Sequence, residues 1–161
     1  MKMTPRQATG ARFLLNMRND EVAKTISVHP RMLGKYEKGH EYLITDRIEP
    51  LRNFYEKSGV EFIHGGVKLR APITDHATQP SVEQCRAARG LLGFTCTKLA
   101  VHAGLSLDVV NKFENGRELL RGSVDKLLKF FAAEGIQLVP GGAQDLQQER
   151  HASFPMRRAL K

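Results

Sequence analysis

The sequence predicts a mostly α-helical protein made of two tandem small helical domains of four to five helices each, with short β-strand or hairpin tails. An internal repeat divides most of the 161-residue chain into two similar units. Within each unit, apolar residues recur at the i, i+3, i+4, i+7 spacing of helices that bury one face. Apolar residues make up 41% and charged residues 26% of the chain, which is typical of globular proteins and not of disordered ones.

The two units are related by a shift of 77 residues, which becomes 76 after one deletion. The first shift aligns ten identical residues without a gap, namely Gln7, Ala11, Arg12, Leu14, Leu15, Ala23, Lys35, Glu37, Gly39 and Glu41 with Gln84, Ala88, Arg89, Leu91, Leu92, Ala100, Lys112, Glu114, Gly116 and Glu118. We therefore place the first unit at residues 1–70, a linker with a proline near each end at 71–80, the second unit at 81–142 and a basic C-terminal tail at 143–161.

The first unit is expected to contain four short helices followed by a hairpin. The hairpin is predicted because the short apolar segments Val60–Ile63 and Val67–Arg70 flank the pair Gly65-Gly66. Turn and capping residues set the expected helix limits at Arg6–Leu15, Asn19–Thr25, Pro30–Tyr36 and Asp46–Lys57.

The second unit repeats this layout with clearer signals. Ser81, Thr95 and Ser106 are placed to accept a hydrogen bond from the first turn of the first three helices, of which the second covers Cys96–Ala103. The fourth helix is expected to start at about Ser123 and to end at Gly135, before an extended segment, Ile136–Val139. The segment 143–161 is either a short docked helix or a frayed tail.

The charge of the chain points to a polyanionic partner. The net charge is +8 and the pI is about 9.8, which favours nucleic acid over an anionic membrane surface. The first unit is the more basic, with 13 basic and 8 acidic residues (+5) against 8 and 6 (+2) in residues 81–142.

Other function classes lack their signals in the sequence. We expect no signal peptide, since Met1 is not followed by an apolar stretch, and no membrane span. Cys85 and Cys96 are too few for a disulfide scaffold. Without a phosphate-binding glycine loop, a metal-ligand set or a nucleophile–base pattern, we expect no enzyme, no metal and no cofactor. The expected location is the cytoplasm, in association with the nucleoid.

One segment of the second unit, Leu91–Gly116, resembles the helix-turn-helix of the Cro/lambda-repressor (XRE-type) family of prokaryotic transcriptional regulators. The matching residues are Leu99-Ala100 on the second helix, Gly104 and Leu105 at the turn, Val110 on the third helix and the ending Glu114-x-Gly116. In the first unit, the corresponding places are held by Val22-Ala23, Ser27, Val28, Leu33 and Glu37-x-Gly39.

The resemblance implies DNA binding through the start of the second helix and the exposed face of the third helix of each unit. The residues that it places there are Asn19, His29, Arg31, Lys35, Lys38, Cys96, Thr97, Ser106, Leu107, Asp108, Asn111 and Lys112. Arg31 is the best candidate to read guanine O6/N7, and Asn111 the best candidate for an adenine edge.

Some residues depart from the family pattern. Asn19 and Cys96 replace the glutamine that many members carry at the start of the second helix. Asp108 would repel phosphate but accept a hydrogen bond from a cytosine amino group. Gly34, inside the first recognition helix, costs about 1 kcal/mol of helix stability relative to Ala.

Several features have more than one interpretation from sequence. Arg12 and Arg89 either clamp phosphates or pair with Glu37 and Glu114. Cys85 reads as a core residue, while Cys96 is either a DNA-contact position or a redox-sensitive thiol at a helix N-terminus. The strand tails cover each helical core, pair with a second copy to give a homodimer, or pair with each other within one chain to give a pseudo-two-fold molecule.

We therefore expect a sequence-specific, double-stranded DNA-binding transcriptional regulator whose two units read adjacent major-groove half-sites. RNA polymerase or another regulatory protein is a further expected partner, and no membrane is involved. The alternative is a protein-interaction module on the same fold, such as an anti-activator or antitoxin, in which one or both units no longer read DNA.

Overall fold

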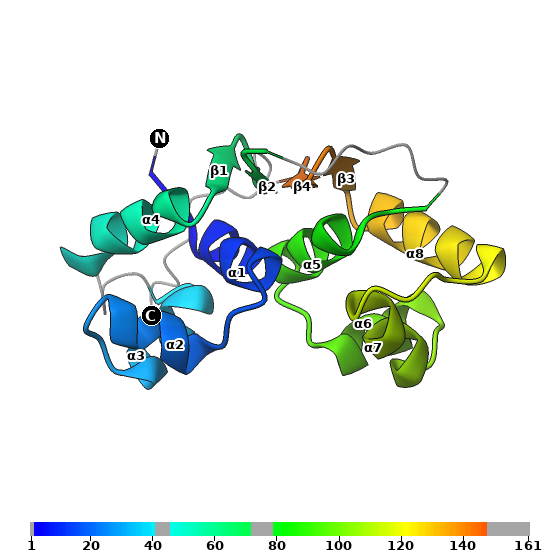
Figure 1. Ribbon diagram of the computed structural model, residues 1–161, viewed down its shortest axis with the longest axis horizontal. Coiled ribbons are helices and arrows are strands. Elements are labelled where there is room, and N and C mark those ends of the chain that lie inside the picture. Colours follow the sequence, from blue (N-terminus) through cyan, green and yellow to red (C-terminus); the bar gives the residue numbers. More distant parts are fainter. Residues whose placement is uncertain (1, 41–45, 72–78, 148–161) are drawn as a thin grey trace, which may run out of the picture.

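The computed structural model describes residues 2–40, 46–71 and 79–147. Over these residues the fold is mostly helical, as predicted, and it contains one small antiparallel sheet (Figure 1). The N-terminal half holds α1 (Pro5–Leu14), α2 (Asn19–Thr25), α3 (Pro30–Glu37), α4 (Ile48–Lys57), β1 (Val60–Ile63) and β2 (Gly66–Leu69). The C-terminal half holds α5 (Val82–Leu91), α6 (Cys96–Ala103), α7 (Leu107–Glu114), α8 (Arg121–Ala133), β3 (Ile136–Val139) and β4 (Gly142–Asp145).

The first helix of each half is capped and anchored in the same way. Gln7 N–H donates to Thr4 Oγ1 (3.2 Å), and Gln84 N–H donates to Ser81 Oγ (3.2 Å). The two glutamine side chains also donate through Nε2 to a strand carbonyl of their own half, Gln7 to Ile63 and Gln84 to the matching Val139. Each glutamine therefore closes a helix terminus and fixes a hairpin to that helix.

The expected caps of α6 and α7 are confirmed. Thr95 Oγ1 accepts from Lys98 N–H (3.1 Å) and Ser106 Oγ accepts from Val109 N–H (3.2 Å). The start of α8 was predicted too late, because the helix begins at Arg121 without a side-chain cap and Ser123 lies inside it. Between α2 and α3 the turn residue Ser27 has φ +54°, in the left-handed region that Gly104 occupies between α6 and α7 (φ +66°).

The four strands form one sheet in the order β1-β2-β4-β3. The expected hairpin of the N-terminal half is present, and it pairs through β2 with β4 of the C-terminal half. Of the three roles considered for the tails, the structure shows two, since the strands pair within one chain and also bury Val60, Val67, Ile136 and Ala143 in the helical core. At the centre Val67 lies opposite Ala143, its counterpart in the repeat; the flanking pairs are Gly66 with Gln144 and Lys68 with Gly142.

Strand β4 was not predicted, since its residues were assigned mainly to the C-terminal tail. Its sequence, Gly-Ala-Gln-Asp, lacks apolar alternation, yet Ala143 is fully buried and Asp145 is 4% exposed. Small residues are needed because a Cβ at Gly66 or Gly142 would collide with the backbone of the paired strand. The remaining tail residues, 148–161, and most of the expected linker, 72–78, lie outside the described residues.

The two halves share one core. Buried apolar residues of both halves form a single cluster, and α1 packs along α5 at its centre (Figure 1). The helices approach closely at Gly90, where a Cβ would lie 2.7 Å from Gly10 Cα and 2.9 Å from the Thr9 carbonyl oxygen. Arg6 of α1 also forms an ion pair with the buried Asp145 of β4 (2.8 Å). Among the helices that the structure describes, none is long and apolar enough to span a membrane.

Candidate nucleic-acid interface

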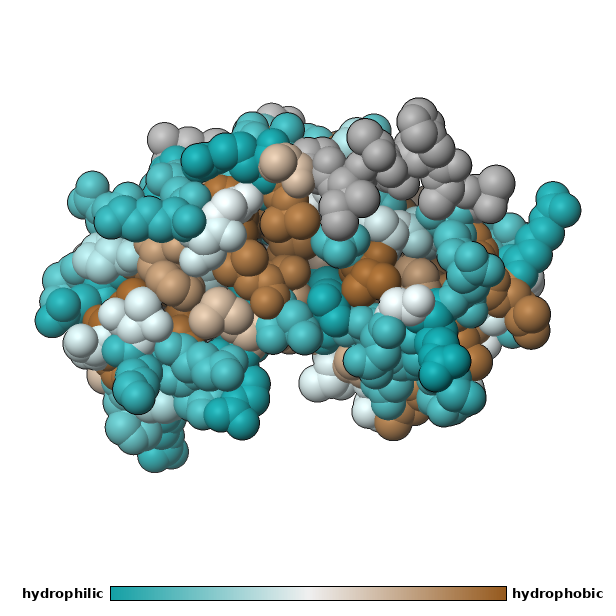
Figure 2. Space-filling model, in the orientation of Figure 1, coloured by the Kyte–Doolittle hydropathy of each residue, from teal (hydrophilic) through white to brown (hydrophobic). Residues whose placement is uncertain are grey.

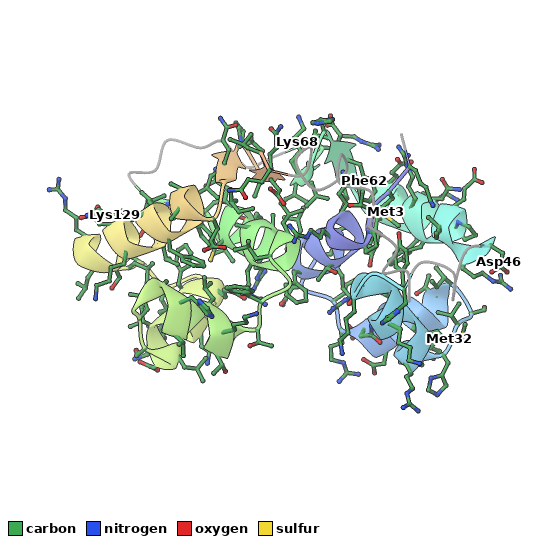
Figure 3. All side chains as sticks on the ribbon, turned by 180° about the vertical axis from the view of Figure 1, so that it is seen from behind. Met3, Met32, Asp46, Phe62, Lys68 and Lys129 are labelled. Atoms are coloured by element: carbon green, nitrogen blue, oxygen red, sulfur yellow. The ribbon has the colours of Figure 1, made fainter. Side chains whose placement is uncertain are left out.

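The α3 and α7 helices lie on the side of the molecule opposite to the sheet (Figure 1). They belong to two lobes, α2–α3 and α6–α7, and the surface is hollowed between these lobes (Figure 2). Seen from behind, Met32 of α3 lies in one of the lower lobes, whereas Lys68 of β2 lies at the opposite edge of the molecule (Figure 3). The molecule therefore presents two projecting helical lobes on one side.

A matched ion pair, half-buried in the N-terminal half and buried in the C-terminal half, holds each of these helices to the first helix of its half. Arg12 donates through Nε and Nη2 to Glu37 at the end of α3 (both 2.7 Å). Arg89 makes the same two bonds to Glu114 at the end of α7 (2.6 and 2.7 Å), and the Arg86 guanidinium lies 3.9 Å from that carboxylate. Of the two roles considered for Arg12 and Arg89, clamping phosphate or pairing with a glutamate, the structure shows the pairing with Glu37 and Glu114. Planar bidentate pairs fix orientation as well as distance.

The structure exposes most of the residues that the resemblance places on DNA. Ten of the twelve are exposed, and the other two, Asn19 and Cys96, are half-buried. The exposed ten are His29, Arg31, Lys35, Lys38, Thr97, Ser106, Leu107, Asp108, Asn111 and Lys112.

The exposed face of α3 is cationic. His29 Nδ1 accepts from Arg31 N–H (3.2 Å), so the imidazole caps the helix while the Arg31 side chain extends into solvent. None of the ion pairs within the described residues involves Arg31, Lys35 or Lys38. From residue 29 to 40 the chain carries three Lys or Arg and one Glu, and this Glu is neutralised by Arg12.

The corresponding face of α7 is close to neutral. The matched segment, residues 106–117, carries two basic and two acidic residues. Lys112 Nζ lies 2.8 Å from Asp108 Oδ2 in an exposed i,i+4 pair. Such a pair contributes only about 0.3–0.5 kcal/mol to stability, but it places a carboxylate beside the ammonium group that would meet phosphate. The two lobes therefore present different charges at equivalent positions.

The starts of α2 and α6 point partly inward. The amide of Asn19 lies beside α3, since a Cβ built on Gly34 would be 3.8 Å from Asn19 Nδ2. Cys96 Sγ donates to Glu114 Oε2 (3.8 Å). Burial raises the pKa of the Cys96 thiol above its ordinary value, with Glu114 adding to the shift against the opposing effect of Arg89, which disfavours a reactive thiolate. Cys85 is fully buried, as predicted.

Arg117 is a cation on this face that the sequence interpretation overlooked. It lines a shallow pocket of about 430 Å³ together with Lys112 and Val109 of α7 and the segment before α8. The repeat aligns Arg117 with His40, shortly after the third helix of each unit. A comparison of the charged residues at aligned positions beyond the third helix would therefore have identified Arg117.

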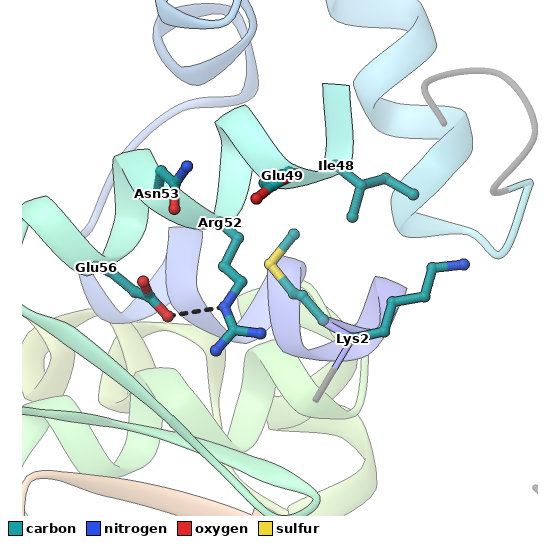
Figure 4. A pocket seen from close by; sticks show the side chains of 7 residues that line it. Lys2, Ile48, Glu49, Arg52, Asn53 and Glu56 are labelled. Carbon is teal, nitrogen blue, oxygen red and sulfur yellow. Dashed lines mark hydrogen bonds and ion pairs between the residues drawn. The ribbon is translucent and has the colours of Figure 1, made fainter. Parts of the chain in front are cut away.

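A second hollow, of about 510 Å³, lies beside α4 and is lined by the N-terminal segment (Figure 4). Its Arg52 forms an ion pair with Glu56 (2.7 Å). Its lining holds no histidine, cysteine, serine or threonine. Across the described part of the chain, no three His, Cys, Asp or Glu side chains are grouped to hold a metal ion.

No family model, curated protein or solved structure matches this chain. The side that carries α3 and α7 is therefore the basis for a functional proposal.

Proposed function

We propose that this protein is a sequence-specific double-stranded DNA-binding transcriptional regulator with two tandem helix-turn-helix domains. The observation that supports it is the pair of eight-residue helices, α3 and α7, on one side of the molecule, each with exposed polar side chains at its start. A helix of this width fits a major groove about 12 Å wide, and two lobes on one side reach two successive grooves.

The chemistry of the exposed side chains suits this role. Arg31 offers a bidentate donor for guanine, Asn111 both donates to and accepts from adenine, and Lys35 supplies charge to the phosphate backbone. The bidentate Arg–Glu pairs hold both helices in fixed orientations before binding. Pre-organisation of this kind reduces the entropic cost of docking.

A second candidate function, a protein-interaction module, has support in the C-terminal half. Val101 is 73% exposed and Leu128 is 40% exposed. The repeat aligns these two residues with Lys24 and Arg52, so the C-terminal half exposes apolar side chains where the N-terminal half carries cations. Exposed apolar side chains of this kind are typical of protein contacts when they form a patch.

The test is binding of the purified protein to fragmented genomic DNA at ~0.15 M salt, where weak electrostatic contacts are screened, followed by sequencing of the bound fraction. We expect a recurrent motif that Lys35→Ala weakens. Lys129→Ala is the control, because Lys129 is also exposed but lies on α8, away from the α3–α7 face (Figure 3). Motif-free binding that both variants weaken equally would contradict the proposal and favour the protein-interaction module. The double variant Val101→Lys, Leu128→Arg would then be the next to test.

A further inference from the structure

The two halves of the chain are related by an internal two-fold axis through the sheet. Every pair within the hairpin β1–β2 recurs 76 residues later within β3–β4, for example Val60–Leu69 as Ile136–Asp145. The contacts between the hairpins are reciprocal as well. Leu69 N–H donates to the Gly141 carbonyl (3.0 Å), and the counterpart of Leu69, Asp145, donates to the Gly65 carbonyl (2.9 Å). In each of these contacts, a residue of one hairpin bonds to the counterpart of the residue that its own counterpart bonds to. A two-fold rotation produces this exchange of partners, whereas a translation of one half onto the other does not.

The relation extends from the sheet to α3 and α7. Gln7 and Gln84 connect each hairpin to α1 or α5, and the pairs Arg12–Glu37 and Arg89–Glu114 connect those helices to α3 or α7. Each link lies within one half and recurs in the other half between the counterpart residues of the repeat. The two-fold relation therefore carries over from the strands to the exposed helices.

From this symmetry we infer that the DNA site is an inverted repeat with unlike arms, bound by one chain in one orientation. The inference rests on the proposed DNA-binding function and specifies its substrate. Because duplex DNA has local two-fold axes perpendicular to its length, two helices related by a two-fold axis meet sequences that run in opposite directions. A flexible linker alone would equally allow direct repeats, but the shared sheet and core fix the inverted arrangement.

The arms are unlike because counterpart positions on the two helices carry different chemistry. Where α3 presents Arg31, a donor to guanine, α7 presents Asp108, an acceptor for the cytosine amino group. Where α3 has Gly34, without a side chain, α7 has the exposed Asn111, which suits adenine. At the same distance from the centre we therefore expect guanine in one arm and cytosine in the other. The arm centres should lie about 10 base pairs apart, one helical turn.

The test uses the full chain and duplexes built from the motif selected on genomic DNA. Four duplexes of equal spacing are compared by fluorescence anisotropy: the selected site, the site with one arm reversed to give a direct repeat, and two symmetric sites carrying two copies of either arm. We expect the selected site to bind best. A wrong arm should cost roughly 10-fold or more, and the direct repeat about 100-fold, because only one lobe then engages.

A variant separates the reading residues from the framework. Asp108→Arg places on α7 the side chain that α3 carries, so it should shift preference toward the symmetric site built from two α3 arms, with only a small loss of thermal stability from the removed pair with Lys112. Arg121→Ala, at an exposed position at the start of α8, should leave the preference among the four duplexes unchanged.

The outcomes are distinct. Equal affinity for the direct repeat, or a selected motif with identical arms, would overturn the inference while leaving the DNA-binding function in place. If no motif is selected at all, the proposed function fails and the inference fails with it. Preferential binding of the unlike inverted repeat, with the expected shift in Asp108→Arg, would support both.

Discussion

The close approach of α1 and α5 provides a test of the arrangement of the two halves. In Gly90→Ala, the new methyl group would lie 2.7 Å from Gly10 Cα and 2.9 Å from the Thr9 carbonyl oxygen. Carbon atoms in contact normally lie about 3.5–4.0 Å apart, so the helices would have to separate by about 1 Å. Both obstructing atoms belong to the backbone, so side-chain rotation cannot relieve the contact.

The magnitude follows from two opposing effects. Replacing a helical glycine by alanine stabilises a helix by about 1 kcal/mol, while overpacking a filled core costs about 1–3 kcal/mol. Gly122→Ala in α8 is the matched control, since its Cβ would meet no atom within 4 Å. We expect Gly122→Ala to be stabilising and Gly90→Ala to be less stable than that control by about 1–3 kcal/mol.

The assay is urea unfolding followed by circular dichroism, with the free energy of unfolding obtained by linear extrapolation for both variants and the wild type. An increase in stability for Gly90→Ala that equals that of Gly122→Ala would refute the close packing of α1 on α5.

Three further predictions concern the ion pairs, the turn and the exposed lysines. Glu114→Gln leaves the buried Arg89 guanidinium without its carboxylate, so thermal unfolding should show a loss of about 3 kcal/mol, and an effect below 1 kcal/mol would contradict a buried pair. Ser27→Gly should raise the melting temperature, with a gain of about 0.5–1 kcal/mol, because the left-handed φ of +54° disfavours a side chain; a lower melting temperature would argue against that turn. Lys35→Ala should reduce the log–log salt slope of DNA affinity by about one unit, and Lys112→Ala by less, because Asp108 already offsets its charge; equal slopes would remove this distinction.

Local signals were sufficient for the helices. Ser81, Thr95 and Ser106 each accept the first-turn hydrogen bond expected of them, because a hydroxyl before an apolar periodic segment has few other roles. The repeat carried this pattern into the N-terminal half, where the turn residue is Ser27 in place of a glycine. Prediction succeeded here because both signals act over a few residues.

Strand β4 escaped prediction because its residues are chosen by contacts that are distant in sequence. Gly142 must be small for β2 to pair beside it, and Ala143 is buried by packing that no periodicity reveals. The choice between pairing within one chain and pairing between two copies also depended on tertiary contacts, since a linker of ten residues permits both.

For the candidate site, exposure was well predicted and orientation was not. The residues on α3 and α7 face solvent because the apolar stripe fixes which side of each helix is buried. Cys96 turns toward Glu114, whose buried position between two helices could not be read from a linear pattern. The same holds for the choice between phosphate and Glu37 as the partner of Arg12.

Phe13 gives the two halves fixed and different places at their junction. Its ring contacts the guanidinium groups of both Arg12 and Arg89, whose central carbons lie 4.7 and 4.4 Å from the ring centroid. The counterpart of Phe13 in the repeat is Gly90, which leaves room for the neighbouring helix. A second N-terminal half in place of the C-terminal one would bring its Phe13 to the position of Gly90, where even a Cβ would lie 2.7 Å from Gly10 Cα. Two N-terminal halves therefore cannot pack against each other in this way, so a domain-swapped assembly of several chains would not pair them at this contact.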